Sequence, residues 1–511
     1  MVPKLPLFNW LNSRGAGVLL HPTSLPGEQG VGVLDRNADR FLDFLQACGI
    51  THWQICPLGP TGYGDSPYQC FSAFAGNPNL IDLGDLAERG LLTPQEIAPL
   101  AGLGRDRVDY GELYRLKPAL LGRAAERYFR QGAPALGAEG FAEFKRRNSP
   151  WLDAYAAFRA LKDHHGGWSW TDWPAALRTH AGALRLPLLA KLSASCEAHR
   201  FSQYAFFSQW QRVRIEAARR GVSIIGDVPI FVAADSADVW ANPGLFELDP
   251  SSGLQRTAAG VPPDYFSEDG QFWGNPLYAW DRHAVDGYAW WTARLKAAFE
   301  LCDVVRIDHF RGFESYWRVP LPAKTARDGA WVQGPGLGLF RALATAIPGA
   351  RIIAEDLGVV TPAVERLREQ SGLPGMAVLQ FAFGGDAKNP YLPHNLVPNQ
   401  VVYPGTHDND TSAGWYAGAG EKTRDHIRRY LRVGGGEVSW DLIRCAYAAV
   451  SRLAVVQMQD ILSLGSDSRL NTPAKPDGNW QWRLGPGQLE GLFARTAPYL
   501  RDLGELTDRI R

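Results

Sequence analysis

The order of apolar and polar positions along the chain predicts strands that alternate with helices. Short runs rich in β-branched residues recur, and each is followed by a Gly, Pro or Asp loop and then by a helical period. The runs are Val18 to Leu20, Trp53 to Pro57, Val222 to Ile230, Val304 to Asp308, Arg351 to Asp356, Met376 to Phe383 and Val401 to Thr406. Such alternation is typical of parallel βαβ units, so the pattern predicts an α/β fold.

Two helix starts can be located from the sequence. After the run that ends near Leu357, Thr361 is expected as the N-cap, Pro362 as the first helical residue and Gly372 as the stop. The segment Thr93-Pro94-Gln95-Glu96 has the spacing of a capping box. Polar residues at the end of the strand that precedes Thr361 are therefore expected in a βα loop.

Strand signals fade between about residues 85 and 220, where helical periods such as Lys117 to Arg130 and Phe201 to Arg220 dominate. No linker composition separates two domains. We expect a single catalytic domain over residues 1–511, with a largely helical insertion at about 85–220 and a loop insertion at about 235–285. The stretch Gly465 to Gly478 leads into Asn479-Trp480-Gln481-Trp482-Arg483, so we expect a structured loop there.

Composition narrows the classes of partner. The 511 residues include 53 Lys and Arg and 53 Asp and Glu, so the net charge is zero. Nucleic acid and anionic membranes are therefore not expected as partners. Six scattered Cys residues without a CxxC pair favour a reduced, cytoplasmic compartment. The chain is rich in aromatic rings, with 18 Trp, 17 Tyr and 23 Phe residues, and has only 3 Met residues. A large core explains many of these rings, but several fall on predicted loops.

Charged residues at the ends of predicted strands are the strongest local signal. Arg306 and Asp308 are i and i+2 on one strand and project to the same side, opposite to Val305 and Ile307. A neighbouring Arg keeps an Asp ionised, which a nucleophile requires. On the next strand, Glu355 is in phase with Ile353, so we expect Glu355 rather than its neighbour Asp356 to face the site.

A third strand ends in Thr406-His407-Asp408-Asn409-Asp410. Carboxylates at three separate strand ends form one site only in a closed barrel, whose catalytic groups gather at the C-terminal face. A helix cap or a buried ion pair explains any one of them equally well, but the three together favour a site. Paired carboxylates with a third anionic group are suited to glycoside chemistry.

Metal, phosphate and serine chemistry have weaker support. The sequence contains no HExxH, EF-hand, GxxxxGK[ST] or GxSxG pattern. His309 and His407 each adjoin a candidate Asp and are candidate metal ligands, but no third His has a recognisable spacing. We interpret both as hydrogen-bonding groups for sugar hydroxyls and expect neither a metal nor a cofactor.

Two predicted loops combine aromatic rings with small polar groups. Residues 61–69 include Tyr63, Asp65, Ser66 and Tyr68, and residues 261–276 include Asp264, Tyr265, Phe266 and Trp273. A pyranose presents apolar faces and polar edges, and this mixture of side chains matches both. Neither loop carries the positive charge that stacked nucleotides require. Packing of the loops by buried rings is the alternative.

These motifs resemble those of the 4-alpha-glucanotransferases called amylomaltases or disproportionating enzymes, glycoside hydrolase family 77. The resemblance extends from His21-Pro22-Thr23-Ser24-Leu25-Pro26-Gly27 through Gly226-Asp227-Val228-Pro229-Ile230-Phe231-Val232 to Gly478-Asn479-Trp480. It implies a (β/α)8 TIM barrel with inserted, largely helical subdomains and without the separate C-terminal β-domain of the related α-amylases. One motif departs from the family: Leu470-Asn471-Thr472-Pro473-Ala474 stands where Met-Asn-x-Pro-Gly is usual.

The resemblance also implies roles for individual residues. Asp308 in RIDH resembles the nucleophile, Glu355 in AEDLG the general acid/base, and Asp408 in THDND the transition-state stabiliser. Arg306, His309 and His407 resemble ligands of subsite −1, and Tyr68 resembles the active-site tyrosine. Tyr63 resembles a residue of a second glucan site, and Tyr265 and Phe266 lie in a segment that resembles a mobile loop over the acceptor subsites. The remaining expected substrate-binding residues are Ser66, Asp65, Asp264, Trp273 and Asn479.

The implied reaction is a retaining transfer of α-1,4-glucan segments to the 4-hydroxyl of an acceptor glucan or glucose. An α-amylase-like hydrolase, which uses the same three carboxylates, is the nearest alternative, and a non-catalytic glycan-binding protein is another. The expected partners are α-1,4-glucans, maltooligosaccharides and glucose, without nucleic acid or membrane. The expected assembly is a monomer or weak homo-oligomer.

Overall fold

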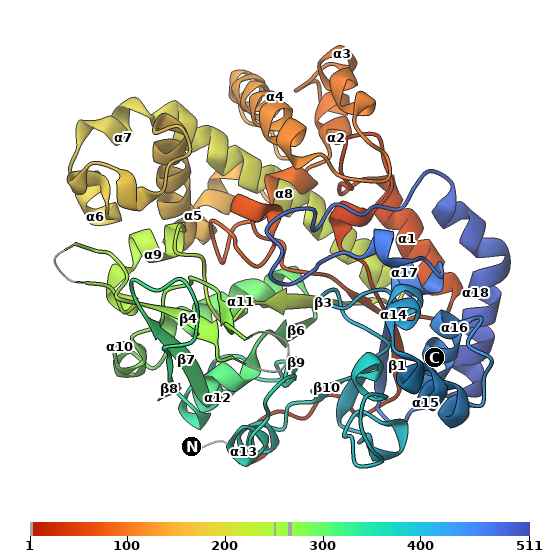
Figure 1. Cartoon of the computed structure of the whole chain (residues 1–511). Coiled ribbons are helices and arrows are strands. Elements are labelled where there is room, and N and C mark those ends of the chain that lie inside the picture. The colour runs from red at the N-terminus through yellow and green to blue at the C-terminus, as the bar shows by residue number, and fades with distance from the viewer. Residues whose placement is uncertain (1–3, 250–251, 264–267, 511) are drawn as a thin grey trace.

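Eight parallel strands form the larger sheet of the protein. The computed structural model describes residues 4–249, 252–263 and 268–510. Paired in the order β10, β11, β12, β1, β2, β3, β6 and β9, the strands enclose the centre of the fold (Figure 1). Their bounds are β1 Gly15–Leu19, β2 His52–Gln54, β3 Ser223–Val228, β6 Val304–Ile307, β9 Ile352–Ala354, β10 Gly375–Val378, β11 Gln400–Tyr403 and β12 Leu453–Gln457. The predicted (β/α)8 barrel is confirmed.

The sheet closes between β9 and β10. The Ala354 amide donates to the Pro374 carbonyl at 2.9 Å, and the Met376 amide donates to Asp356 Oδ1 at 2.7 Å. A backbone bond and a side-chain carboxylate thus join the two ends of the strand order.

Seven of the eight strands coincide with predicted runs, and β12 is the one that the pattern missed. Its apolar segment Leu453–Gln457 is only five residues long. It follows α16 (Val438–Ala448) after four residues, so periodicity alone does not separate it from the helix.

Alternation along the strands separates an inner layer from an outer one. The side chains inside the barrel are Leu11, Leu19, Ile225, Val304, Ile353, Met376, Val378, Val401, Tyr403, Leu453 and Val455. Val305 and Ile307 pack instead into the outer core with the helices, as predicted. Since Val304 faces inward, Arg306 two residues later does so too.

Helices surround the barrel. Their bounds are α1 Arg36–Ala47, α2 Leu83–Glu88, α3 Pro94–Ile97, α4 Tyr110–Arg130, α5 Phe141–His164, α6 His180–Ala183, α7 Pro187–Lys191, α8 Ser193–Arg219, α9 Ala237–Ala241, α10 Trp280–Val285, α11 Ala289–Leu301, α12 Leu337–Ala346, α13 Pro362–Ser371, α14 Ser412–Gly418, α15 Glu421–Leu431, α16 Val438–Ala448, α17 Met458–Ile461 and α18 Gln488–Leu506. Within the described residues, none combines the length and apolar character needed to cross a membrane.

Both of the helix starts that the sequence predicts are present in the structure. Thr361 accepts a hydrogen bond from the Val364 amide, and α13 ends at Gly372, whose φ of 77° suits a residue without Cβ. The capping box between Thr93 and Glu96 is also present. Both signals depend on local side-chain chemistry, which explains why sequence alone locates them.

Three long connections stand out from the barrel, those between β2 and β3, between β3 and β6, and between β6 and β9. Helices α2 to α8 lie between β2 and β3 and gather along the top of the view (Figure 1). An antiparallel sheet, in the order β5 (Gln271–Phe272), β4 (Thr257–Val261), β7 (Ser315–Pro320) and β8 (Ala330–Gln333), lies at the lower left. The sequence pattern predicts only a loop for the first two of these short strands. Assignment of about 85–220 and 235–285 as insertions into one domain stays a prediction.

The N-terminal end of the barrel is held by a buried arginine from the C-terminal tail. The Arg509 side chain has no exposed surface. Its guanidinium donates to the carbonyls of Tyr447, Gly15, Arg452, Ala446, Ala449 and Ser451 at 2.7–3.1 Å. Because Gly15 begins β1 and Arg452 precedes β12, this single group ties the first strand to the last.

We expect Arg509→Met to destabilise the protein by about 3 kcal/mol, because buried carbonyls that lose their donor keep the cost of their desolvation. The matched control is Arg501→Met on α18, whose exposed side chain also donates to two carbonyls, those of Ala47 and Gln46. Thermal unfolding followed by circular dichroism measures both. Equal unfolding midpoints for the two variants would contradict the stabilising role of Arg509.

Candidate active site

The end of β6 carries a buried arginine between two carboxylates. The Arg306 side chain is 3% exposed, and its Nη1 donates to Asp227 Oδ2 at 2.6 Å. Nη2 lies 3.1 Å from Asp308 Oδ1. A guanidinium removed from water in this way needs opposite charge close by, and two strand ends, β3 and β6, supply it.

Glu355 and Asp356 at the end of β9 face opposite ways. Glu355 Oε2 accepts a hydrogen bond from the His309 amide at 2.7 Å, and Oε1 accepts one from the Leu357 amide at 3.0 Å. Asp356 instead pairs with Arg368 of α13 at 3.0 Å. As the strand alternation predicts, the two neighbours lie in different surroundings, and Glu355 is the one beside the residues of β6.

Burial and mutual repulsion separate the proton affinities of the two carboxyl groups. Burial raises the pKa of Asp308 to about 6, although the charge of Arg306 acts to lower it. Burial, and next the charge of Asp308, raise the pKa of Glu355 to about 8. Near neutral pH, the arrangement therefore favours an ionised Asp308 beside a protonated Glu355.

The loop after β11 brings a third carboxylate to the same place. Asn471 donates from Nδ2 to Asp408 Oδ1 at 2.6 Å, and His407 Nε2 lies 3.3 Å from Oδ2. Burial acts to raise the pKa of Asp408, but His407 and Asn471 outweigh it and hold this pKa below its usual value. Burial likewise acts to lower the pKa of His407, and Asp408 raises it above the usual value.

Aromatic rings form one wall of the site. The Tyr68 hydroxyl donates to Asp227 Oδ2 at 2.8 Å, and its ring stacks on His407 with centroids 5.1 Å apart. Trp480 packs against both rings, with centroid distances of 5.8 and 5.9 Å. The rings of the predicted Trp273 and of His309 form a T-shaped pair with centroids 4.8 Å apart. Burial lowers the pKa of His309 to about 3, which keeps that imidazole neutral.

Other predicted binding residues are hydrogen-bonded to neighbouring protein groups, Asp65 to helix α4 and the others within their own loops. Asp65 accepts a hydrogen bond from the Tyr114 hydroxyl at 2.7 Å, and the Ser66 hydroxyl accepts one from the Tyr68 amide at 3.2 Å. Asn479 accepts from the Thr472 amide and donates to the Lys475 carbonyl, both at 2.8 Å, so its amide closes the loop after α17.

Some predicted residues lie outside the described part of the chain. These are the side chain of Tyr63 and the residues Asp264, Tyr265 and Phe266. The structure therefore adds no geometry to the binding roles expected of them.

Asp227, Asn471 and Trp480 also lie at the site, although the sequence pattern does not predict them as site residues. Asp227 had a usable signal, since it stands near the end of a predicted strand like the three carboxylates. Asn471 and Trp480 reach the site from a loop far along the chain, and no local pattern marks such a contact. Among the described residues, no cluster of three or more His, Cys, Asp or Glu side chains is arranged to hold a metal ion.

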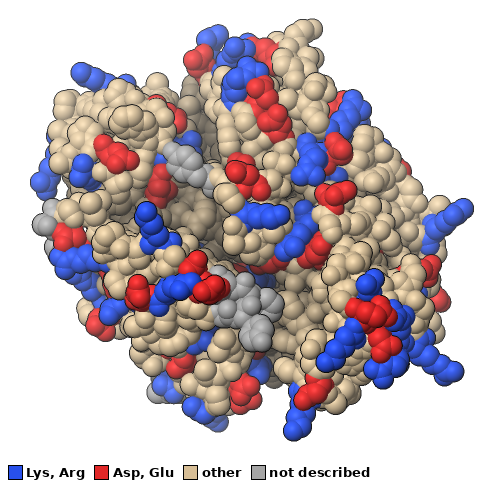
Figure 2. Space-filling model, in the orientation of Figure 1, with Lys and Arg blue, Asp and Glu red and all other residues tan. Residues whose placement is uncertain are grey.

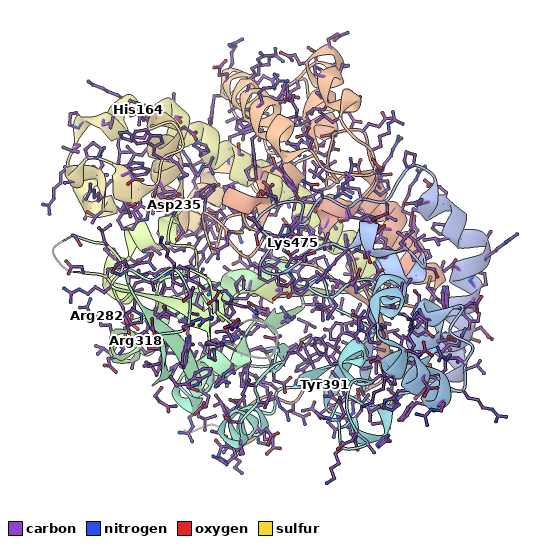
Figure 3. The ribbon with its side chains drawn as sticks, in the orientation of Figure 1. His164, Asp235, Arg282, Arg318, Tyr391 and Lys475 are labelled. Carbon is purple, nitrogen blue, oxygen red and sulfur yellow. The ribbon has the colours of Figure 1, made fainter. Side chains whose placement is uncertain are left out.

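The face toward the viewer is hollowed near its middle, and Lys, Arg, Asp and Glu are interspersed over it without a large region of one sign (Figure 2). Lys475, on the loop that Asn479 closes, lies near the centre of the same view (Figure 3). The loop after α17 therefore lies over the middle of the molecule, where its Asn471 meets Asp408.

A closed parallel barrel with carboxyl groups at the ends of β6, β9 and β11 defines a class of protein. One ionised and one protonated carboxyl group, with a third anionic group beside them, characterise barrel enzymes that act on glycosidic bonds.

Comparison with known proteins identifies the family within that class. A family model described as 4-alpha-glucanotransferase, glycoside hydrolase family 77, matches residues 20–488. The chain is 50% identical over 506 residues to the 4-alpha-glucanotransferase of Thermus thermophilus, covering 97% of this chain and 99% of that one. Identity to the enzyme of Synechocystis sp. is 46% over 504 residues, covering 96% and 98%.

A solved structure resembles the whole fold. The amylomaltase from Streptococcus agalactiae in complex with acarbose superposes with a TM-score of 0.91 at 36% identity, covering 98% of this chain and 100% of that one. The chain belongs to the 4-alpha-glucanotransferase family, glycoside hydrolase family 77.

Removing Asp227 tests how much the buried ion pair contributes. We expect Asp227→Ala to cost about 3 kcal/mol of stability, because Arg306 stays buried with one carboxylate fewer. Glu490→Ala breaks the ion pair with Arg40, in which both side chains are about half exposed, and should cost less than about 1 kcal/mol. Urea unfolding of both variants checks this contrast, and a near-neutral result for Asp227→Ala would refute it.

Proposed function

We propose that the protein transfers α-1,4-glucan segments from a donor to the 4-hydroxyl of an acceptor glucan or glucose by a retaining double displacement. The observation that carries the proposal is the juxtaposition of Asp308, ionised near neutral pH, with Glu355, protonated near neutral pH. Membership of the 4-alpha-glucanotransferase family and the likeness to an amylomaltase complexed with acarbose support it.

In the first step, a carboxylate oxygen of Asp308 attacks C1 of the donor glucose unit. The bond from C1 to the glycosidic oxygen breaks, and Glu355 gives its proton to that oxygen as the shortened glucan departs. The product is a glucan joined to Asp308 through an ester bond, and Glu355 is left ionised.

In the second step, the 4-hydroxyl of an acceptor sugar attacks C1 from the same side as the departed group. Glu355 takes the hydroxyl proton, the ester bond to Asp308 breaks, and a new α-1,4 bond forms. Both carboxyl groups then have their starting protonation states, so no cofactor is needed to balance the reaction.

Four further groups stabilise the oxocarbenium-like charge and hold the sugar. Asp408 is ionised, and its negative charge opposes the positive charge that develops at C1. The neutral His309 and His407, whose pKa Asp408 raises, offer hydrogen bonds to hydroxyls, and the ring of Tyr68 offers a flat apolar face.

Transfer exceeds hydrolysis only where an acceptor sugar competes successfully with water for the ester. Trp273, which is partly exposed beside His309, offers the site an apolar ring, and the buried Trp480 supports the Tyr68 and His407 rings; an apolar ring favours a sugar face over bulk water. Product analysis separates a transferase from an α-amylase-like hydrolase more sharply than the presence of such rings does. α-1,4-Glucans, maltooligosaccharides and glucose as partners, the cytoplasm as compartment, and a monomer or weak homo-oligomer all remain predictions.

Incubation with maltotriose tests the function. We expect a ladder of shorter and longer maltooligosaccharides with little increase in reducing ends, because each broken α-1,4 bond is replaced by another. Asp308→Asn should reduce transfer by more than about a thousandfold, since it removes the nucleophile. Asp281→Asn, on the exposed side of α10, is the control and should leave the rate unchanged.

Rising reducing ends without a ladder indicate the hydrolase instead. Binding of maltooligosaccharides without turnover indicates the glycan-binding protein. Full transfer by Asp308→Asn would overturn the assignment of the nucleophile.

The pH dependence of kcat/KM gives a second test. Activity should fall below about pH 6, as Asp308 becomes protonated, and above about pH 8, as Glu355 loses its proton. Because the groups interact, the two limbs belong to the pair. Glu355→Gln assayed with a maltosyl fluoride, whose leaving group needs no proton, should lose the basic limb and keep the acidic one. A basic limb that survives in Glu355→Gln would contradict the role of Glu355.

A further inference from the structure

A methionine inside the barrel completes the hydrogen bonding of Arg306. Arg306 Nε donates to the sulfur of Met376 on β10 at 3.4 Å. The Met376 side chain is 2% exposed and lies in the interior cluster. With Nη1 on Asp227 and Nη2 on Asp308, the sulfur is the third contact of the guanidinium.

The contact with the Met376 sulfur fixes the tilt of the guanidinium plane, which the contacts with Asp227 and Asp308 leave free. The guanidinium is a rigid plane, so Nε, Nη1 and Nη2 move together. Contacts at Nη1 and Nη2 alone leave the plane able to tilt about the line through those two atoms. An acceptor at Nε removes this tilt and thereby sets the direction in which the N–H groups of Nη2 point toward Asp308.

Met376 is itself held firmly. Its amide donates to Asp356 Oδ1 at 2.7 Å, and its carbonyl accepts from Gln400 Nε2 at 3.3 Å. Asp356 adjoins Glu355 on β9 and is paired with Arg368. The backbone of Met376 is therefore fixed relative to the segment that carries Glu355, and burial in the interior cluster confines the side chain whose sulfur meets Arg306.

We infer that Met376 is a positioning residue for the transfer reaction: its sulfur orients the Arg306 guanidinium, which in turn holds the Asp308 carboxylate for attack. The inference rests on the function proposed above. A thioether suits this place because it accepts a weak hydrogen bond without adding a charge or an N–H group to an apolar interior.

The alternative is that Met376 only fills space. Leucine has a similar volume and no acceptor, so Met376→Leu separates the two roles. Met458 offers a matched control. It is fully buried, and its sulfur accepts no hydrogen bond from the described residues, so Met458→Leu makes the same chemical change away from Arg306.

The readout is the acidic limb of the kcat/KM profile for transfer. The titratable and charged groups that face Asp308 are Arg306, Asp227, Asp408, His407, Glu355 and Tyr68. Of these, Met376→Leu disturbs Arg306 directly. A displaced guanidinium stabilises the Asp308 carboxylate less, so the limb should move to higher pH, by about 0.5 units, with a fall in kcat of about three- to tenfold.

Norleucine keeps the shape of methionine and lacks only the sulfur. The chain has three methionines, at positions 1, 376 and 458. In the Met458→Leu protein, replacement of methionine by norleucine thus changes residues 1 and 376 alone. This protein tests the inference even where Met376→Leu fails to fold, and its acidic limb should shift in the same direction.

An acidic limb that matches the control in both the Met376→Leu and the norleucine protein would overturn the inference. Failure of the proposed function is detected separately, by comparing the wild-type protein, which should transfer glucan, with the Asp308→Asn variant, which should not. The acidic limb is then compared only among variants that transfer glucan. A shift of equal size in Met458→Leu would also overturn the inference, since the effect would then follow from any loss of sulfur in the core.

Discussion

The burial of one guanidinium at the C-terminal rim of the barrel governs the chemistry of the site. Arg306 is removed from water between β3, β6 and β10, and each of these strands or the residue after it supplies one partner: Asp227, Asp308 and Met376. An isolated charge in such a place is costly, so the surrounding groups are constrained by the need to compensate it. The same positive charge keeps Asp308 ionised in a buried site, which leaves the proton of the pair on Glu355.

Strand alternation made much of this predictable. Arg306 and Asp308 share a side of β6 because they are two residues apart, and Glu355 and Asp356 are separated because they are neighbours on β9. Caps at Thr93 and Thr361 were equally readable, since the side chain that makes each bond lies within three residues of the amide. In each case the deciding interaction is local in sequence.

The rest of the site depends on contacts between distant segments. Asn471 reaches Asp408 from a loop 63 residues further on, and Trp480 meets Tyr68 across most of the chain. The sequence pattern predicts Met376 only as an apolar strand residue, because the closed barrel is what places its sulfur beside Arg306. Resemblance to the family supplied the expected roles of Asp308, Glu355 and Asp408, but the partners that set their charges required three-dimensional structure.

Closure of the barrel has a consequence for how the chain matures. β1 pairs with β2 on one side and with β12 on the other, so one of its edges waits for residues 453–457. The carbonyl of Gly15 then receives a donor from Arg509. During synthesis, which proceeds from the N-terminus, an apolar strand edge near the start of the chain therefore stays unpaired until nearly all of the polypeptide has left the ribosome. Because β2 occupies only the opposite edge of β1, protection of the unpaired edge in the growing chain falls to transient contacts with other emerging segments or to a chaperone.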